Sequence, residues 1–236
     1  MNFSSRIYEK ELLDRDDIPF ADIKKNMEEI KVINTKLGGF AITLAGLKAL
    51  LGNRRSAVIC EIGCGAGDNL EAIHSWCIQN IIDVKLVGID IKKECIEAAR
   101  QNRQLLFCTQ WICEDYRDVL FRYKPDIIFS SLFCHHFTER ELVPQLQWLK
   151  NNCAVGFFIN DLHRHWLAYY SIKLLTKMFS SSYLVKNDAP LSVARGFRKR
   201  EWLYLTRKAG LPDASVEWKW AFRHLVTWRN NAAPSF

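Results

Sequence analysis

The stretch Val58-Ile-Cys-Glu61-Ile-Gly63-Cys-Gly65-Ala-Gly67 decides the fold of this chain. An apolar run passes directly into a turn that holds three alternate glycines, and a helical pattern begins just after it. Glycine adopts positive φ and lets a ligand approach the backbone closely, and the first N–H groups of a helix attract an anionic group. The stretch therefore predicts a buried strand, a ligand-binding turn and a helix in succession.

Strand and helix patterns alternate on both sides of this turn. We expect strands at 57–62, 84–91, 105–113, 125–131 and 154–161, and helices at 67–79, 92–102, 140–150 and 164–179. Strands that alternate with helices of this length form a parallel sheet with right-handed crossovers. The middle of the chain is thus predicted to be α/β and doubly wound.

The C-terminal end of the chain has a different pattern. We expect a polar loop at 180–190 and a helix near 198–209. Alternating apolar residues predict a strand at 214–222, and 224–228 can pair with it as an antiparallel hairpin.

The N-terminal third carries two helical patterns, at 20–34 and about 41–51, joined by Gly38-Gly39. We predict that residues 1–52 form a helical lid, with the two glycines as its joint, that closes over the ligand site. The alternative is a plain packing layer over the edge of the sheet.

Composition limits the class of protein. The chain has 236 residues, of which 49% are hydrophobic, which suits one sizeable domain. It has no apolar run long enough to span a membrane and no apolar segment typical of a secretory signal near Met1, so we expect a cytoplasmic protein. The eight cysteines form no Cys-x-x-Cys pair and are expected to be buried free thiols rather than zinc ligands.

The positive charge of the chain is uneven. The formal net charge is +7, and residues 151–236 hold 13 Lys and Arg against 5 Asp and Glu. This basic excess could attract an anionic substrate, a carrier protein or nucleic acid, or could be a solvated face without a partner.

Three acids help to identify the ligand of the glycine turn. Asp68 stands where the dinucleotide fingerprint Gly-x-Gly-x-x-Gly has its third glycine, and Glu61 precedes the first glycine by two residues. Asp90 ends the next strand, where its carboxylate can accept hydrogen bonds from both hydroxyls of a ribose. Asp90 could instead cap the helix that begins near Lys92.

Together these residues resemble motifs I and II of class I methyltransferases that use S-adenosylmethionine (SAM). The resemblance implies a Rossmann-like sheet of seven strands, mostly parallel, with an antiparallel edge hairpin at the C-terminal end. It implies SAM as the cofactor and S-adenosylhomocysteine as its product. The cofactor-binding residues that it implies are Glu61, Gly63, Gly65, Gly67, Asp90, Ile91, Asp115, Tyr116 and Ser131. Glu114 is a rival of Asp115 for the contact with adenine. Residues 53–236 would form the SAM-binding domain, with a substrate-facing helix at about 162–180.

The segment Leu132-Phe-Cys-His135-His136-Phe137 resembles the ubiquinone/menaquinone-biosynthesis-like branch of this family. The run Asn160-Asp-Leu-His-Arg-His-Trp-Leu-Ala-Tyr-Tyr170, with the later 187–192, looks like a bacterial subgroup that often accompanies polyketide or phenolic-metabolite pathways. By analogy the branch implies O- or C-methylation of a small phenol, quinol or related molecule.

The two histidines are candidates for the catalytic base, with His136 slightly preferred. A neutral imidazole can take the proton of a phenol near pH 7, and adjacent side chains diverge, so one of them is expected to act. The alternative is one buried structural histidine and one surface histidine.

Five side chains after the fifth strand are expected to bind the substrate: His163, His165, Trp166, Tyr169 and Tyr170. Aromatic and histidine side chains next to the methyl donor suit a flat aromatic acceptor. In the competing interpretation Asp161 caps the following helix and the aromatic side chains pack in the core.

Other sites and activities fit less well. Asn160-Asp161 is similar to the Asp-Asn pair of magnesium-dependent catechol methyltransferases, but Ser130-Ser131 stand where those enzymes have a further acid, so no metal site is expected. An RNA or protein methyltransferase is a first alternative. The segment 130–133, Ser-Ser-Leu-Phe, lacks the Asp/Asn-Pro-Pro-aromatic motif of enzymes that methylate adenine or amide nitrogen, and nucleic acid is not expected as the partner. A catalytically inactive SAM-binding partner module is a second alternative.

Overall fold

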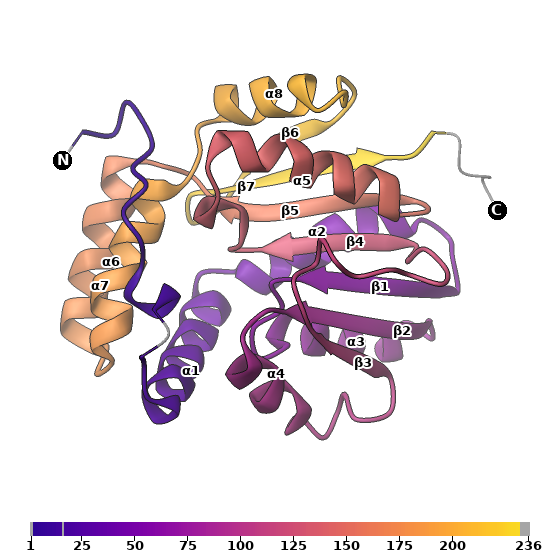
Figure 1. The fold of residues 1–236 in the computed structure, drawn as a ribbon, viewed down its shortest axis with the longest axis horizontal. Coiled ribbons are helices and arrows are strands. Elements are labelled where there is room, and N and C mark those ends of the chain that lie inside the picture. Colours follow the sequence, from indigo (N-terminus) through magenta and orange to yellow (C-terminus); the bar gives the residue numbers. More distant parts are fainter. Residues whose placement is uncertain (1, 16, 232–236) are drawn as a thin grey trace.

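Seven strands form one sheet in the order β3-β2-β1-β4-β5-β7-β6 in this computed structural model, which describes residues 2–15 and 17–231 (Figure 1). The strands are β1 (Ser56–Ile62), β2 (Asp83–Asp90), β3 (Thr109–Cys113), β4 (Ile127–Ser131), β5 (Gly156–Leu162), β6 (Ser215–Lys219) and β7 (Arg223–Arg229). Strands β1 to β5 pair in parallel, whereas β7 pairs antiparallel with β5 and β6. The predicted mostly parallel sheet with an antiparallel C-terminal edge is confirmed.

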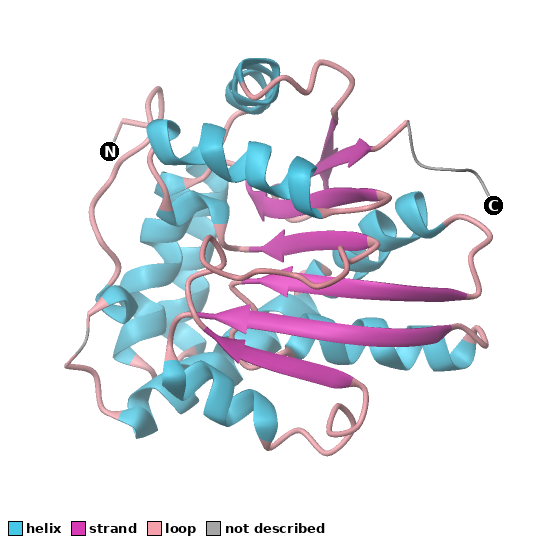
Figure 2. Cartoon of the chain, turned by 45° about the vertical axis from the view of Figure 1, so that its right-hand side comes forward, coloured by secondary structure: helices cyan, strands magenta, loops and turns pink. Residues whose placement is uncertain are grey.

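Helices cover both faces of the sheet (Figure 2). The α-helices are α1 (Phe20–Lys36), α2 (Gly39–Leu51), α3 (Asp68–Gln79), α4 (Lys93–Arg100), α5 (Glu139–Asn152), α6 (Trp166–Phe179), α7 (Tyr183–Arg195) and α8 (Lys199–Lys208). Apolar side chains of α2, α3 and α4 form the core on one face, and those of α5 and α8 form the core on the other. The sheet is thus buried on both sides, as a parallel sheet requires.

The carboxyl ends of the parallel strands point toward α1, α6 and α7 (Figure 1). The N-terminal segment, drawn in indigo, runs past α6 and α7 at this edge before α1 begins (Figure 1). We call residues 3–14 the N-terminal strap; it includes the short 3-10 helix η1 (Leu12–Asp14). In open α/β sheets, ligands bind at the carboxyl edge, so the strap lies where a site is expected.

The loop predicted at 180–190 is wrong, because most of this segment belongs to α7. Asn, Asp and Pro are typical of loops, and Pro190 lies inside the helix, where it lacks an N–H to donate. Ser182 caps the helix by accepting a hydrogen bond from the Val185 N–H, 3.4 Å away. Leu184, Val185 and Leu191 are buried. Burial of this apolar side outweighs the poor local propensity.

The third strand is shorter than expected. Only Thr109–Cys113 is extended, and residues 101–108 form turns in place of the start of a strand. The Leu105 N–H donates to the Asn102 carbonyl, which closes a turn. The Leu86 N–H of β2 donates to the Cys108 carbonyl, so the chain begins to pair with β2 only just before β3.

All eight cysteines are free thiols, and six of them are buried. Within the described part of the chain, no single helix has the length and apolar character needed to cross a membrane. Helices α1 and α2 have the necessary length and apolar character only when taken together, and the chain bends by 69° at the break between them.

Candidate active site

The glycine turn joins β1 to α3, as predicted. Gly63, Gly65 and Gly67 all have positive φ, of 67°, 53° and 81°. A Cβ on Gly63 would lie 2.2 Å from the Phe133 ring, and one on Gly67 would lie 2.5 Å from Trp111, whereas one on Gly65 would meet no atom within 4 Å. The neighbouring rings therefore leave no room for a side chain at Gly63 or Gly67. Gly65 faces open space, in which a ligand can approach the backbone.

Glu61 is buried beneath this turn, with 1% of its surface exposed. Its Oε1 accepts a hydrogen bond of 2.9 Å from Asn69 Nδ2, and its Oε2 is buried without a hydrogen-bond partner. Burial raises the pKa of this carboxyl well above its usual range, despite the opposing effect of Asn69. A buried acceptor without a partner is costly, and the ammonium group of a methionine-containing cofactor would satisfy it.

Asp90 connects the turn to the end of β2. Its Oδ2 accepts the Gly65 N–H at 2.9 Å, and its Oδ1 accepts the Lys92 N–H at 2.9 Å. Lys92 is the N-cap residue of α4, so the carboxylate serves the start of that helix as well as the turn. Each carboxylate oxygen can accept more than one hydrogen bond, and both oxygens can still accept a ribose hydroxyl.

The remaining predicted cofactor residues lie around the same edge. Ile91 follows Asp90 and has 68% of its surface exposed, so an apolar face is free next to the Asp90 carboxylate. Asp115 is held by Arg117 in an ion pair, and the guanidinium lowers the pKa of this carboxyl. The Tyr116 ring is buried against Phe133, which leaves its backbone rather than its side chain for a ligand.

A tight turn after β4 places the two histidines. Ser131 ends β4 and is buried, and Leu132 follows with a φ of 54°, unusual for a branched side chain. Phe133 then packs against Gly63, and the 3-10 helix η2 (Cys134–His136) begins. We call residues 132–137 the histidine loop. This loop is therefore in direct contact with the glycine turn.

His135 is buried in a network of carboxylates. Its Nδ1 lies 2.8 Å from Asp161 Oδ1, at the end of β5, and its Nε2 lies 3.5 Å from Glu11 Oε1 of the N-terminal strap. Burial by itself lowers the pKa of this imidazole, but the two carboxylates outweigh it and raise the pKa to about 9. His135 is accordingly a buried cation at neutral pH.

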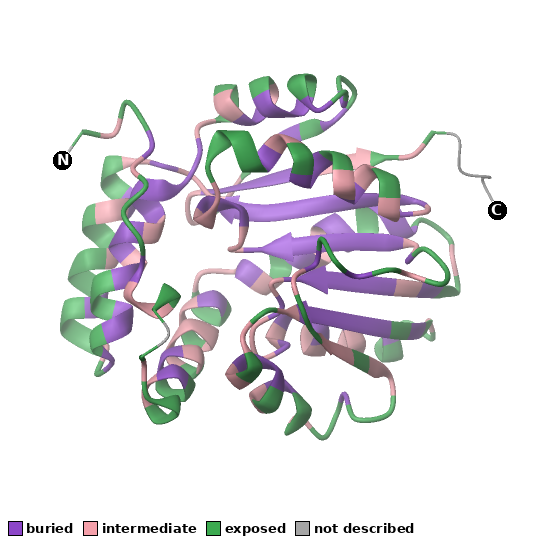
Figure 3. Cartoon of the chain, viewed as in Figure 1, coloured by how far each residue is buried: buried purple, intermediate pink, exposed green. Residues whose placement is uncertain are grey.

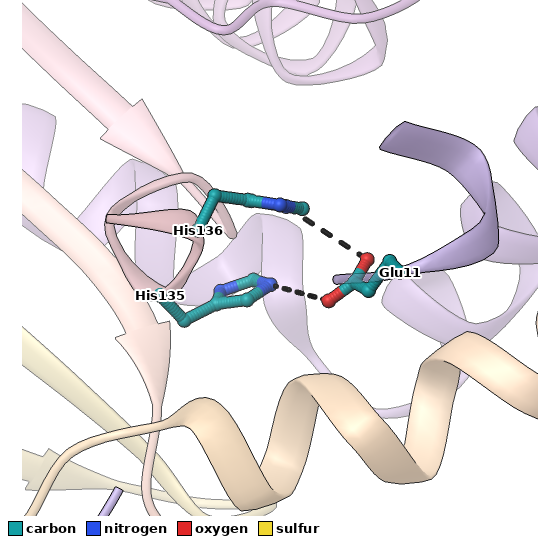
Figure 4. Close-up of side chains that lie close together, drawn as sticks. All are labelled: Glu11, His135 and His136. Atoms are coloured by element: carbon teal, nitrogen blue, oxygen red, sulfur yellow. Dashed lines mark ion pairs between the residues drawn. The ribbon is translucent and has the colours of Figure 1, made fainter. Parts of the chain in front are cut away.

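His136 is more accessible, with 25% of its side chain exposed. Its Nδ1 lies 3.3 Å from Asp14 Oδ1, and its Nε2 lies 3.9 Å from Glu11 Oε2, beyond hydrogen-bond distance. The two imidazole rings lie side by side and both face Glu11 (Figure 4).

Two arginines complete the network. Arg195 of α7 donates to the carbonyls of His135 and His136, and Arg6 donates to those of His135 and Phe137. Arg195 also lies 3.5 Å from Asp14 and 3.8 Å from Glu11. The strap, α7 and the histidine loop are thus joined by buried charged contacts.

Glu11, His135 and His136 are the group in the described residues whose potential metal-ligand atoms lie within 4.8 Å of one another. Glu11 Oε1 already accepts a hydrogen bond of 2.7 Å from Ser192 and faces Arg195. A divalent cation would be repelled by Arg195, which lies 3.8 Å from Glu11. The surroundings favour an ion-pair network over a metal centre.

The structure divides the five predicted substrate residues into two groups. His165 stacks on Phe222 beside the β6–β7 hairpin, and His163 lies against the tilted ring of His224 and accepts a hydrogen bond of 3.2 Å from Trp218 at its Nδ1. Tyr169 and Tyr170 contact the Phe3 ring of the strap, and Trp166 is 56% exposed. His165, not Asp161, caps α6, by accepting the Leu167 N–H.

Comparison with known proteins accounts for this geometry. Residues 59–156, which run from β1 to the start of β5, match the model of the methyltransferase domain family. The match covers the glycine turn, Asp90 and the histidine loop. Residues 59–156 thus carry a methyltransferase domain, and the chain has the fold of solved methyltransferases that bind SAM or S-adenosylhomocysteine. A comparison of the methyltransferase with curated proteins found no match.

Solved structures share its fold. The plantazolicin methyltransferase BpumL in complex with S-adenosylhomocysteine is 17% identical, with a TM-score of 0.67, over 92% of this chain and 91% of that chain. The magnesium protoporphyrin IX methyltransferase ChlM from Synechocystis PCC 6803, with bound SAM, is 12% identical over 84% and 82%, with a TM-score of 0.56. A putative O-methyltransferase from Nostoc punctiforme PCC 73102 is 15% identical over 85% and 60%, with a TM-score of 0.57.

Several residues of the site were not predicted: Asp161 as the partner of His135, and Arg6, Glu11, Asp14 and Arg195. Asp161 could have been found, because β4 and β5 pair in parallel and both end beside the histidine loop. The strap residues carry no sequence signal, since their role depends on where the chain passes in three dimensions.

Proposed function

We propose that the methyltransferase transfers the methyl group of SAM to a small aromatic acceptor of the phenol or quinol type, at oxygen or carbon. His136 is the base that takes the acceptor's proton. The observation that carries this proposal is the contact of the histidine loop with the glycine turn, through Phe133 and Gly63. This contact supports a position of the imidazole beside the transferred methyl group of SAM.

The two histidines have different roles in this proposal. His136 is partly exposed, and its Nδ1 lies 3.3 Å from Asp14 Oδ1 without a hydrogen bond, whereas its Nε2, 3.9 Å from Glu11 Oε2, is the atom that we propose accepts the proton. His135, which is cationic and fully enclosed, holds the loop in place through Asp161 and Glu11.

The proposed chemistry is an in-line displacement. As the acceptor oxygen or ring carbon forms its bond to the methyl carbon, the bond from that carbon to the cofactor sulfur breaks, and S-adenosylhomocysteine leaves. The acceptor proton passes to His136 Nε2. The rings of Phe133 and Phe137, whose centroids lie 4.9 Å apart, flank the histidine loop and suit a flat acceptor.

The test is methylation of a panel of phenols, quinols, carboxylates and amines by the purified protein with SAM, followed by mass spectrometry. We expect a phenol or quinol to be methylated. His136→Gln should then lower kcat by about 10²- to 10³-fold, with the dissociation constant of SAM unchanged. His74→Gln, which changes a partly exposed histidine of α3, is the matched control.

Three outcomes contradict the proposal. Methylation of amines or carboxylates alone would exclude the acceptor class. A His136→Gln variant with the kcat of the unmodified protein would exclude the base. Absence of methylation of every acceptor, while SAM still binds, would favour a SAM-binding partner module.

A further inference from the structure

Helix α6 has its large apolar side chains on the outside. Its buried residues are the small Ala168 and Thr176. The exposed large apolar side chains along the helix are Trp166, Leu167, Tyr170, Leu174, Leu175, Met178 and Phe179, with exposed fractions between 42% and 77%. Figure 3 shows α6 largely green along the left edge of the molecule. We call these seven side chains the α6 face.

This pattern is the reverse of a surface helix in a water-soluble domain, which turns its apolar side inward. Contiguous exposed apolar patches of this kind mark surfaces that bind another molecule or a membrane. Packing within the chain leaves the face exposed: α7 packs against α6, and only Ala168 and Thr176 of α6 are buried. Something outside the chain is expected to cover it.

The charges on α6 indicate what covers it. Lys173 and Lys177 are both exposed, and the helix contains no Asp or Glu. Glu29 of α1 reaches the end of the helix, but its carboxylate is occupied by Ser181 and Ser182, which donate to it at 2.9 and 3.0 Å. The face is therefore apolar with a cationic component.

A second copy of the chain fits this face poorly. In a two-fold dimer the same surface meets itself, so the lysines of one helix would be brought toward those of the other, and α6 supplies no acid to pair with them. An anionic lipid surface supplies both a negative headgroup for each lysine and an apolar layer for the face.

We infer that α6 docks the methyltransferase on the surface of an anionic membrane, with the helix lying in the plane of the interface. Leu174, Met178 and Phe179 enter the outer part of the acyl layer. Trp166 and Tyr170 lie at the level of the headgroups, where such rings are favoured. Lys173 and Lys177 extend their ammonium groups to lipid phosphates.

The position of α6 connects this docking surface to the active site. The helix follows β5, which ends in Asp161, the partner of His135. Tyr169 and Tyr170 contact Phe3, in the same strap that carries Glu11 and Asp14. The carboxyl edge of the sheet therefore faces the side on which the membrane lies.

The experiment is co-sedimentation of the whole protein with vesicles of phosphatidylcholine, with and without phosphatidylglycerol. We expect binding that depends on phosphatidylglycerol. The triple variant Leu174→Ser, Met178→Ser, Phe179→Ser should lower the partition coefficient by roughly 10²-fold. Lys173→Glu with Lys177→Glu should lower it by at least about tenfold.

The matched control is the triple variant Ile81→Ser, Phe107→Ser, Leu120→Ser. These residues are more exposed than the α6 face, at 86%, 100% and 95%, and lie on loops elsewhere. The control should bind vesicles like the unmodified protein, and circular dichroism should show that all variants are folded.

Vesicle binding that is absent, or that is equal in the α6 variant and the control, overturns the inference. Sedimentation velocity addresses the second copy directly. A dimer that the α6 variant converts to a monomer would show that another chain, and not a lipid surface, covers the face.

Discussion

Glu61 shows how a single residue of the glycine turn can report on cofactor binding. It is buried, one of its oxygens has no partner, and its pKa is raised by burial. In the free enzyme the carboxyl therefore retains its proton at higher pH than an exposed glutamate. A cation placed against it favours the carboxylate and lowers this pKa.

We predict that SAM binding releases a proton from Glu61. The affinity for SAM should therefore decrease as the pH falls through the raised pKa of this carboxyl. Titration calorimetry in two buffers of different ionisation enthalpy measures the release directly. Glu61→Gln should abolish it and weaken SAM binding by about 10- to 100-fold, since a charge-assisted hydrogen bond is lost. An observed heat that does not depend on the buffer would contradict this role.

At the scale of elements, the N-terminal strap is attached to the histidine loop by charge. Glu11 faces both imidazoles, and Asp188 accepts the N–H groups of Leu12 and Leu13 at 2.8 and 3.0 Å. Because most of these groups are buried, the attachment depends on their protonation. Loss of one charge leaves its partners buried and unpaired.

We predict that stability falls at alkaline pH through His135. Its folded-state pKa is about 9, above the ordinary value of 6.5. The stabilising contribution is fully present below pH 6.5 and is lost as the pH rises through about 9. The loss is at most on the order of 3 kcal/mol.

Chemical denaturation at neutral pH and above pH 9 tests this prediction. His135→Gln should be less stable than the unmodified protein at neutral pH and should lose less stability on the way to high pH. His74→Gln should follow the unmodified protein. A His135→Gln variant whose stability changes with pH as in the unmodified protein would show that the imidazole is not the charged group.

At the scale of the whole molecule, the contacts at the carboxyl edge of the sheet indicate which part of the predicted lid can move. The strap contacts α7 and the histidine loop, and α1 is joined to α2 at Gly38, whose φ is 72°. We expect residues 1–52 to tighten when SAM and the acceptor bind. The joint lets α1 move while α2 stays packed against β5.

Hydrogen exchange with and without S-adenosylhomocysteine tests the lid. Backbone amides of residues 8–40 should exchange more slowly with the ligand, and those of α5 and α8, on a face of the sheet, should not change. Equal exchange in 8–40 in both states would favour a fixed packing layer.

The sequence by itself determined the parallel sheet, the glycine turn and Asp90. These features are local: three glycines fix a turn wherever it lies, and apolar periodicity fixes strands and crossover helices. The candidate role of His135 and His136 came instead from the resemblance of the segment 132–137 to a branch of the family.

The tertiary structure decided the rest. Glu11 and Asp14 meet the histidines only because the strap crosses the carboxyl edge, a contact between segments far apart in the chain that no local pattern encodes. Helix α7 forms despite Pro190 because its apolar side is buried. The aromatic residues of α6 suggested a substrate pocket or a core, but most of them are exposed, because the fold turns the small residues of that helix inward. Periodicity indicates that one side of a helix is apolar, and only the packing of the whole chain decides which way that side points.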